Sequence, residues 1–128
     1  MTAEVAAACE GAVKAGASDI LVKDAHASVR NIEHSKLPHE ARLIRGWGQH
    51  PLSMLQGLDK SFDAVMLVGF HARGGSGGSP LMHTNDPGHV HVRINDWFAS
   101  EFLVFAYGLP GWACRYRSSQ ATNGWSSR

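Results

Sequence analysis

The sequence has few of the features that mark exported, disulfide-bonded or membrane-spanning proteins. It contains only two cysteines, Cys9 and Cys114, and no CxxC pair, so neither a disulfide framework nor a thiolate zinc site is expected. No apolar run approaches the roughly 20 residues that span a bilayer, and no basic segment followed by an apolar one opens the chain. These absences predict a soluble cytoplasmic protein with no membrane partner.

An excess of charge of one sign is also missing. Twelve Lys and Arg residues oppose 11 Asp and Glu residues, which gives a formal net charge of +1 at pH 7. Such a balance gives no electrostatic reason to expect nucleic acid as a partner. The 128 residues are enough for one domain with a hydrophobic core.

What the sequence does contain is an alternation of helical and extended patterns. The alanine-rich stretch 4–15 predicts a helix, with Thr2 as its cap and Gly16 at its end. This alternation predicts an α/β fold, a single layered domain with a mainly parallel sheet flanked by helices. The other expected elements are strands at 19–22, 41–45, 62–70 and 89–94, and helices at 51–58 and 97–107.

Potential metal ligands follow several of these elements. Asp24 and His26 follow the first predicted strand, His71 follows the third, and Glu101 lies beyond the fourth. Strand ends converge at one edge of an α/β sheet, so such side chains can meet over one ion. At His26, a neutral imidazole suits zinc and Asp24 can help to bind or orient it. The alternative for His26 is a residue that only caps a loop.

A glycine-rich loop, residues 74–80, separates His71 from His83. The loop lets the chain fold back so that both imidazoles face one cleft. There, one ring can bind a metal while the other donates to a developing oxyanion or shuttles a proton. Glu101 offers the oxygen ligand that zinc accepts. The alternatives are two solvated loop histidines and a solvated glutamate. Nucleotide binding is not expected, because the loop lacks the Gly-Lys-Ser/Thr ending of a P-loop.

The remaining histidines show no ligand pattern of their own. His89 and His91 lie on one face of a predicted strand, where they add to a site or form a polar sheet face. We expect exposed loop positions for His34, His39 and His50.

Several of these motifs occur together in the order found in the bacterial D-aminopeptidases, a family of zinc-dependent metallopeptidases. Residues 23–26 resemble the family's Asp-x-His motif, and residues 69–73 with 82–84 resemble its glycine-loop histidines. The resemblance extends from Met1 to about Pro110. The other similar segments are 1–5, 10–12, 38–44, 51–54, 57–59 and 92–95, the last followed by Ser100 and Glu101.

The resemblance implies a cofactor, a substrate class and roles for particular residues. In the family each subunit holds two zinc ions. By position, His26 would bind one zinc, His71 and Glu101 the other, and His83 would be the catalytic histidine. The implied reaction is hydrolysis, by a metal-activated water, of short peptides that begin with a D-amino acid. A homo-oligomer is also implied.

The family's Asp-x-Glu motif, on a strand before the first helix, has no counterpart in this sequence. We therefore expect residues 1–110 to form a D-aminopeptidase-like domain without that first strand, followed by an irregular tail at 111–128. We expect a truncated chain with fewer than two zinc ions and impaired hydrolysis. The alternative is a non-catalytic remnant, a metal-binding or oligomerising module with the same fold.

Overall fold

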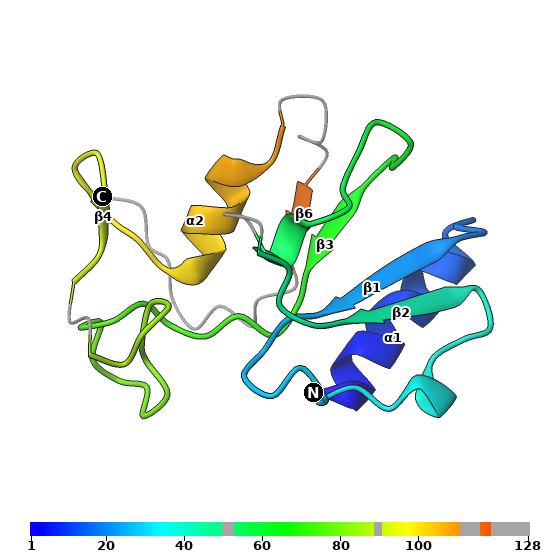
Figure 1. Ribbon diagram of the computed structural model, residues 1–128, viewed down its shortest axis with the longest axis horizontal. Helices are drawn as coiled ribbons and strands as arrows, with labels where there is room; N and C mark the ends of the chain where they lie inside the picture. The colour runs from blue at the N-terminus through cyan, green and yellow to red at the C-terminus, as the bar shows by residue number, and fades with distance from the viewer. Residues whose placement is uncertain (50–52, 89–90, 111–115, 119–128) are drawn as a thin grey trace.

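The computed structural model describes residues 1–49, 53–88, 91–110 and 116–118 (Figure 1). Two of the three strand pairs in this part of the chain are parallel, β1 with β2 and β3 with β6, and the third is the antiparallel hairpin β4–β5. The predicted α/β class is therefore confirmed. The elements are α1 (Thr2–Lys14), β1 (Ile20–Asp24), η1 (His34–Lys36), β2 (Ala41–Arg45), η2 (Ser53–Leu55), β3 (Val65–Leu67), β4 (Arg93–Ile94), β5 (Trp97–Phe98), α2 (Glu101–Gly108) and β6 (Tyr116–Ser118).

The N-terminal half is a helix packed on a parallel strand pair. α1 crosses one face of β1 and β2, which pair in register from Ile20 opposite Ala41 to Asp24 opposite Arg45 (Figure 1). Because the strands are parallel, their carboxyl ends meet at one edge, and the loop that carries His26 leaves from there. The buried cluster between helix and strands consists of Cys9, Val22, Ile32 and Ala41.

The helix α1 begins two residues earlier than the sequence predicts, and Thr2 does not cap it. Met1 is the N-cap residue, and no side-chain hydrogen bond caps this end. The Thr2 hydroxyl instead donates to the Asn31 carbonyl (3.1 Å) and accepts from the Glu33 N–H (3.2 Å), which ties the helix to the loop after β1. Gly16 does mark the helix end, with a φ of 100° that favours glycine.

Two chain reversals shorten the elements predicted in the C-terminal half. The predicted strand 62–70 is confined to β3, because Gly69 turns the chain with a φ of 80°. Asn95, at a φ of 53°, closes the β4–β5 hairpin, so Trp97 and Phe98 form a strand rather than the first turn of α2. Ser100 then caps α2 by accepting from the Leu103 N–H at 3.2 Å.

Parts of three expected elements lie outside the described residues. For the predicted strand 89–94, residues 89–90 are not described, and β4 covers only Arg93 and Ile94. For the predicted helix 51–58, residues 51–52 are not described, and Ser53–Leu55 form a 3-10 turn. In the expected irregular tail, Tyr116–Ser118 instead form β6, parallel to β3. β6 gives the backbone groups of β3 hydrogen-bond partners, which an edge strand otherwise lacks.

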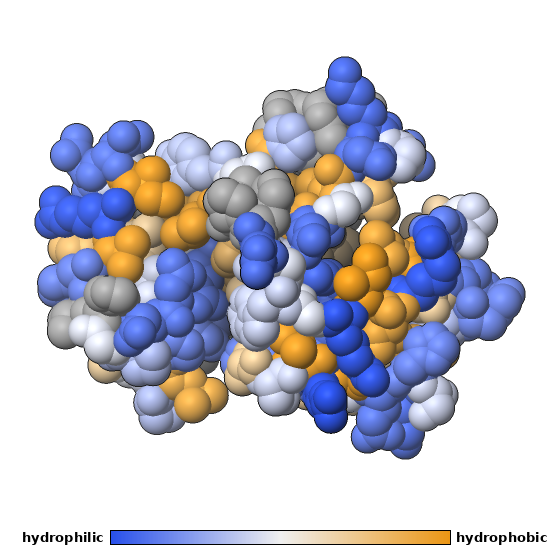
Figure 2. All heavy atoms as spheres, viewed as in Figure 1, coloured by the Kyte–Doolittle hydropathy of each residue, from blue (hydrophilic) through white to orange (hydrophobic). Residues whose placement is uncertain are grey.

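Large apolar side chains reach the surface at many points. Figure 2 shows them on one face as separate patches among hydrophilic residues. None of the helices in the described ranges is long and apolar enough to cross a membrane. The exposed large hydrophobic residues are Met1, Ile44, Trp47, Met66, Leu81, Met82, Trp97, Phe98 and Tyr107.

Candidate metal centre

An aromatic cluster fixes the start of the His71 loop against α2. The Phe70 ring meets Phe102 edge-on, with centroids 6.0 Å apart, and lies 6.3 Å from the buried Phe105. Both partners belong to α2, whose first residue is Glu101. The apolar packing of Phe70 therefore sets the position of His71, its neighbour, relative to Glu101.

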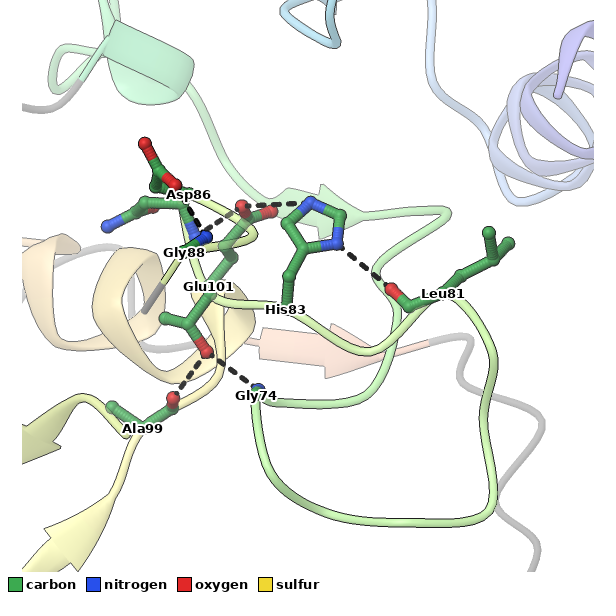
Figure 3. A network of polar contacts seen from close by, with 9 residues as sticks. Gly74, Leu81, His83, Asp86, Gly88, Ala99 and Glu101 are labelled. Atoms are coloured by element: carbon green, nitrogen blue, oxygen red, sulfur yellow. Dashed lines mark hydrogen bonds and ion pairs between the residues drawn. The ribbon is translucent and has the colours of Figure 1, made fainter. Parts of the chain in front are cut away.

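A buried threonine joins the three segments that carry the candidate ligands. Thr84 has no exposed surface, and its hydroxyl donates to the Ala99 carbonyl at 2.9 Å while it accepts from the Gly74 N–H at 3.1 Å (Figure 3). The neighbouring His83 N–H donates to the Ala72 carbonyl at 3.2 Å. One hydroxyl thus holds together the glycine loop, the His83 segment and the entry to α2.

His71, His83 and Glu101 converge at this junction. Their potential ligand atoms all lie within 4.8 Å of one another, and all three residues are partly buried. The two imidazole rings are stacked with centroids 3.9 Å apart and planes inclined by 36°. Residues 30 positions apart in the sequence therefore form one compact group of two imidazoles and a carboxylate.

The hydrogen bonds of His83 define which of its nitrogens is free. Nδ1 lies 2.9 Å from the Leu81 carbonyl, which can only accept, so Nδ1 carries the proton in the neutral ring. The lone pair of Nε2 then faces Glu101, whose Oε1 is 4.0 Å away (Figure 3). The same carboxylate oxygen accepts from the Asn85 N–H at 2.8 Å. Both side chains are therefore oriented by backbone groups.

The donor set fits a zinc ion. His71 Nδ1 is buried without a hydrogen-bond partner among the described residues, an arrangement that a bound cation would satisfy. Imidazole and carboxylate are both ligands that zinc accepts, and binding by His71 and Glu101 would leave coordination positions open for water. Ligands bound to one tetrahedral ion at about 2.1 Å lie roughly 3.4 Å apart, so small side-chain rotations would close the group. Hence His71 and Glu101 can hold a metal here, with His83 beside it.

His26 is not part of this group. It lies exposed in the loop after β1, and Trp47 holds the next residue in place by donating from Nε1 to the Ala27 carbonyl at 3.0 Å. Ala27 and Val29 adopt positive φ angles of 43° and 54°. The structure therefore gives His26 a defined loop and leaves its predicted role as a ligand untested.

Asp24 is committed to holding that loop. Its side chain is buried, and its carboxylate accepts from the Asn31 N–H at 2.7 Å, the Asn31 side chain at 2.9 Å and the Ile32 N–H at 3.0 Å. Burial alone would raise the pKa of Asp24, but these hydrogen bonds together outweigh it and hold the pKa below its ordinary value. Asp24 shapes the His26 loop and has little capacity left to bind a metal.

No sequence pattern pointed to Thr84 and Asn85, which orient the group. A threonine beside a histidine is unremarkable, and only the tolerance of asparagine for the positive φ of Asn85, 62°, hints at a fixed turn. His91 lies against Phe98 at 4.9 Å and outside the group. His34 and His39 are exposed, as expected, while His50 and His89 lie outside the described residues.

Comparison with known proteins places the chain among peptidases. A family model described as D-aminopeptidase matches residues 1–112. The D-aminopeptidase of Bacillus subtilis (strain 168) is 36% identical over 107 residues, which are 84% of this chain and 38% of that protein. A solved structure, the Zn-dependent D-aminopeptidase DppA from Bacillus subtilis, described as a self-compartmentalizing protease, superposes with a TM-score of 0.74 at 34% identity.

The structural match covers 84% of this chain and 38% of the DppA chain, so this chain spans well under half the length of the relatives. The family match, in contrast, includes His26, His71, His83 and Glu101. On these similarities, the chain belongs to the D-aminopeptidase family.

Proposed function

We propose that the group formed by His71, His83 and Glu101 is a zinc-dependent hydrolytic site for short peptides with an N-terminal D-amino acid. The observation that carries the proposal is the convergence of the three side chains within 4.8 Å. The unpartnered His71 Nδ1 supports a cation at this place. Membership of the D-aminopeptidase family supports the reaction and the substrate class.

In this proposal His71 and Glu101 hold the metal, and His83 is the catalytic residue. A zinc ion held by His71 and Glu101 would lower the pKa of a water molecule and polarise the substrate carbonyl. His83 accepts the proton at Nε2, because the bond from Nδ1 to the Leu81 carbonyl keeps Nε2 unprotonated in the neutral ring. Glu101 Oε1, 4.0 Å from Nε2, stabilises the imidazolium until the proton passes to the leaving amine.

Three further features of the sequence-based hypothesis belong to this proposal. His26 is the position that the family resemblance assigns to the other zinc ion, and fewer than two zinc ions per chain are expected. The chain works in the cytoplasm as a homo-oligomer, and the exposed apolar side chains offer contact surface for further copies. The domain covers residues 1–110.

The alternative is a metal-binding or oligomerising module without hydrolytic activity. It is favoured by one observation, that His26 lies outside the group, so that the described residues bring together potential ligands for one ion and not for two. It keeps the fold and the cation at His71 and Glu101 but lacks turnover.

Hydrolysis of D-Ala-D-Ala and L-Ala-L-Ala by the purified zinc-loaded chain separates the two hypotheses. The proposal predicts release of D-alanine that is selective for the D-dipeptide, stops with a chelator and returns with zinc. His83→Ala should abolish turnover and retain zinc, whereas His34→Ala, a change at an exposed histidine in η1, should leave both unchanged. Zinc binding without any turnover would favour the module.

A further inference from the structure

Two arginines and a histidine surround one aromatic ring next to the candidate metal centre. The guanidinium carbons of Arg73 and Arg93 lie 4.6 Å and 4.3 Å from the centre of the Phe98 ring. The His91 imidazole is 4.9 Å from the same centre. Phe98 is 38% exposed, so solvent and ligands reach this cluster.

Among the described residues, no ion pair balances the positive charge of this cluster. Within the described residues, no carboxylate lies within ion-pairing distance of Arg73 or Arg93. Arg42 shows the contrast, because it is held by Asp19 at 2.7 Å. Two guanidinium groups on one ring repel each other, and a bound anion would relieve that repulsion. Stacking on the ring also leaves guanidinium N–H edges free to bind a planar anion with two parallel bonds.

The cluster is built from the segments that form the candidate metal centre. Arg73 lies two residues after His71, and Phe98 lies three residues before Glu101. The Thr84 hydroxyl links their neighbours, since it bonds both Gly74 N–H and the Ala99 carbonyl. Arg73 also donates to the Gly74 carbonyl at 3.0 Å, which restrains its side chain. This buried network therefore positions the metal ligands and Arg73, while Arg93 is placed beside Phe98 by their pairing in the β4–β5 hairpin.

We infer that Arg73 and Arg93, stacked on Phe98, bind the C-terminal carboxylate of the peptide whose amino-terminal end lies at His71 and Glu101. This inference rests on the proposed function. It assigns the substrate class more narrowly, as short peptides with a free C-terminal carboxylate. Removal of the carboxylate or of the two guanidinium groups weakens binding in the same way.

The test uses a dipeptide that the site cannot cleave, D-Ala-D-Ala with a reduced CH2–NH bond in place of the peptide bond. Calorimetry on the zinc-loaded chain compares this compound with its C-terminal amide. The free carboxylate should bind about tenfold or more tightly, the usual effect of charge-assisted hydrogen bonds. Equal affinity, or no binding of either compound, would overturn the inference without any substitution in the protein.

Substitutions then test whether Arg73 and Arg93 are the residues that bind the carboxylate. Arg73→Gln with Arg93→Gln should reduce affinity for the carboxylate to that for the amide, whereas Arg42→Gln, which removes the same charge from an exposed position on β2, should keep the preference. A preference that persists in the double variant contradicts the inference. Calorimetry does not depend on turnover, so a carboxylate preference in a chain that hydrolyses nothing would refute the proposed function and leave this subsite standing.

Discussion

Thr84→Val removes one buried hydroxyl and keeps the shape of the side chain. The Gly74 N–H and the Ala99 carbonyl then lose their partner inside the protein, because Gly74 is buried and Ala99 is 1% exposed. Each unsatisfied group costs about 1–3 kcal/mol, and the added methyl group returns about 0.8 kcal/mol. The net loss of stability is therefore about 1–5 kcal/mol, to be compared with the roughly 5–15 kcal/mol of total stability that small domains possess.

Thr84→Ser is the matched control. It keeps both hydrogen bonds and removes one buried methyl group, so it should cost only about 1 kcal/mol. Urea unfolding followed by circular dichroism gives both free energies, with equal slopes required for the comparison. The zinc affinity, measured by competition with a chromophoric chelator, should fall more in Thr84→Val than in Thr84→Ser. If the valine variant is as stable as the serine variant and binds zinc equally well, the role assigned to the Thr84 network is wrong.

Two other predictions concern stability. Asp24→Asn should destabilise the chain at pH 7. Because the pKa of Asp24 is lower in the folded state, this stabilisation is fully present above the unfolded-state pKa of about 3.9 and is lost as pH falls through the folded value. Urea unfolding at pH 7 and pH 3 should show the difference from wild type shrinking in acid, and a constant difference would contradict the assignment. Ser100→Ala should lower stability by about 1 kcal/mol through loss of the α2 cap, whereas Ser100→Asp should retain it in thermal unfolding; equal melting of both variants would argue against the cap.

Local sequence patterns predicted the helix and strand boundaries that neighbouring residues determine. The short stretch 41–45 was predicted as a strand and forms β2 to its terminal residues, and Gly16 marked the end of α1. The pattern missed the turn at Gly69, because the apolar run continues through it, and it assigned Trp97 and Phe98 to a helix although they pair with β4 across the turn at Asn95. β6 pairs with β3, about 50 residues earlier in the chain, and the residues of β6 show no pattern that identifies this partner strand.

In the candidate site too, local motifs identified some residues, and contacts between distant segments were missed. His71, His83 and Glu101 were singled out from their motifs, and the structure brings all three together. The groups that hold them, Thr84 and the Phe70 packing, act across 25 to 35 positions of sequence, from Gly74 to Ala99 and from Phe70 to Phe105. Such contacts arise from how the chain folds back, which single residue types do not encode.

A crystal structure of the zinc-loaded chain, with anomalous data collected at the zinc edge, tests the central claim most directly. The account predicts an anomalous peak within about 2.2 Å of ligand atoms from His71 and Glu101, with the His83 ring alongside it. A zinc ion bound elsewhere, or no peak between these two side chains, would contradict it.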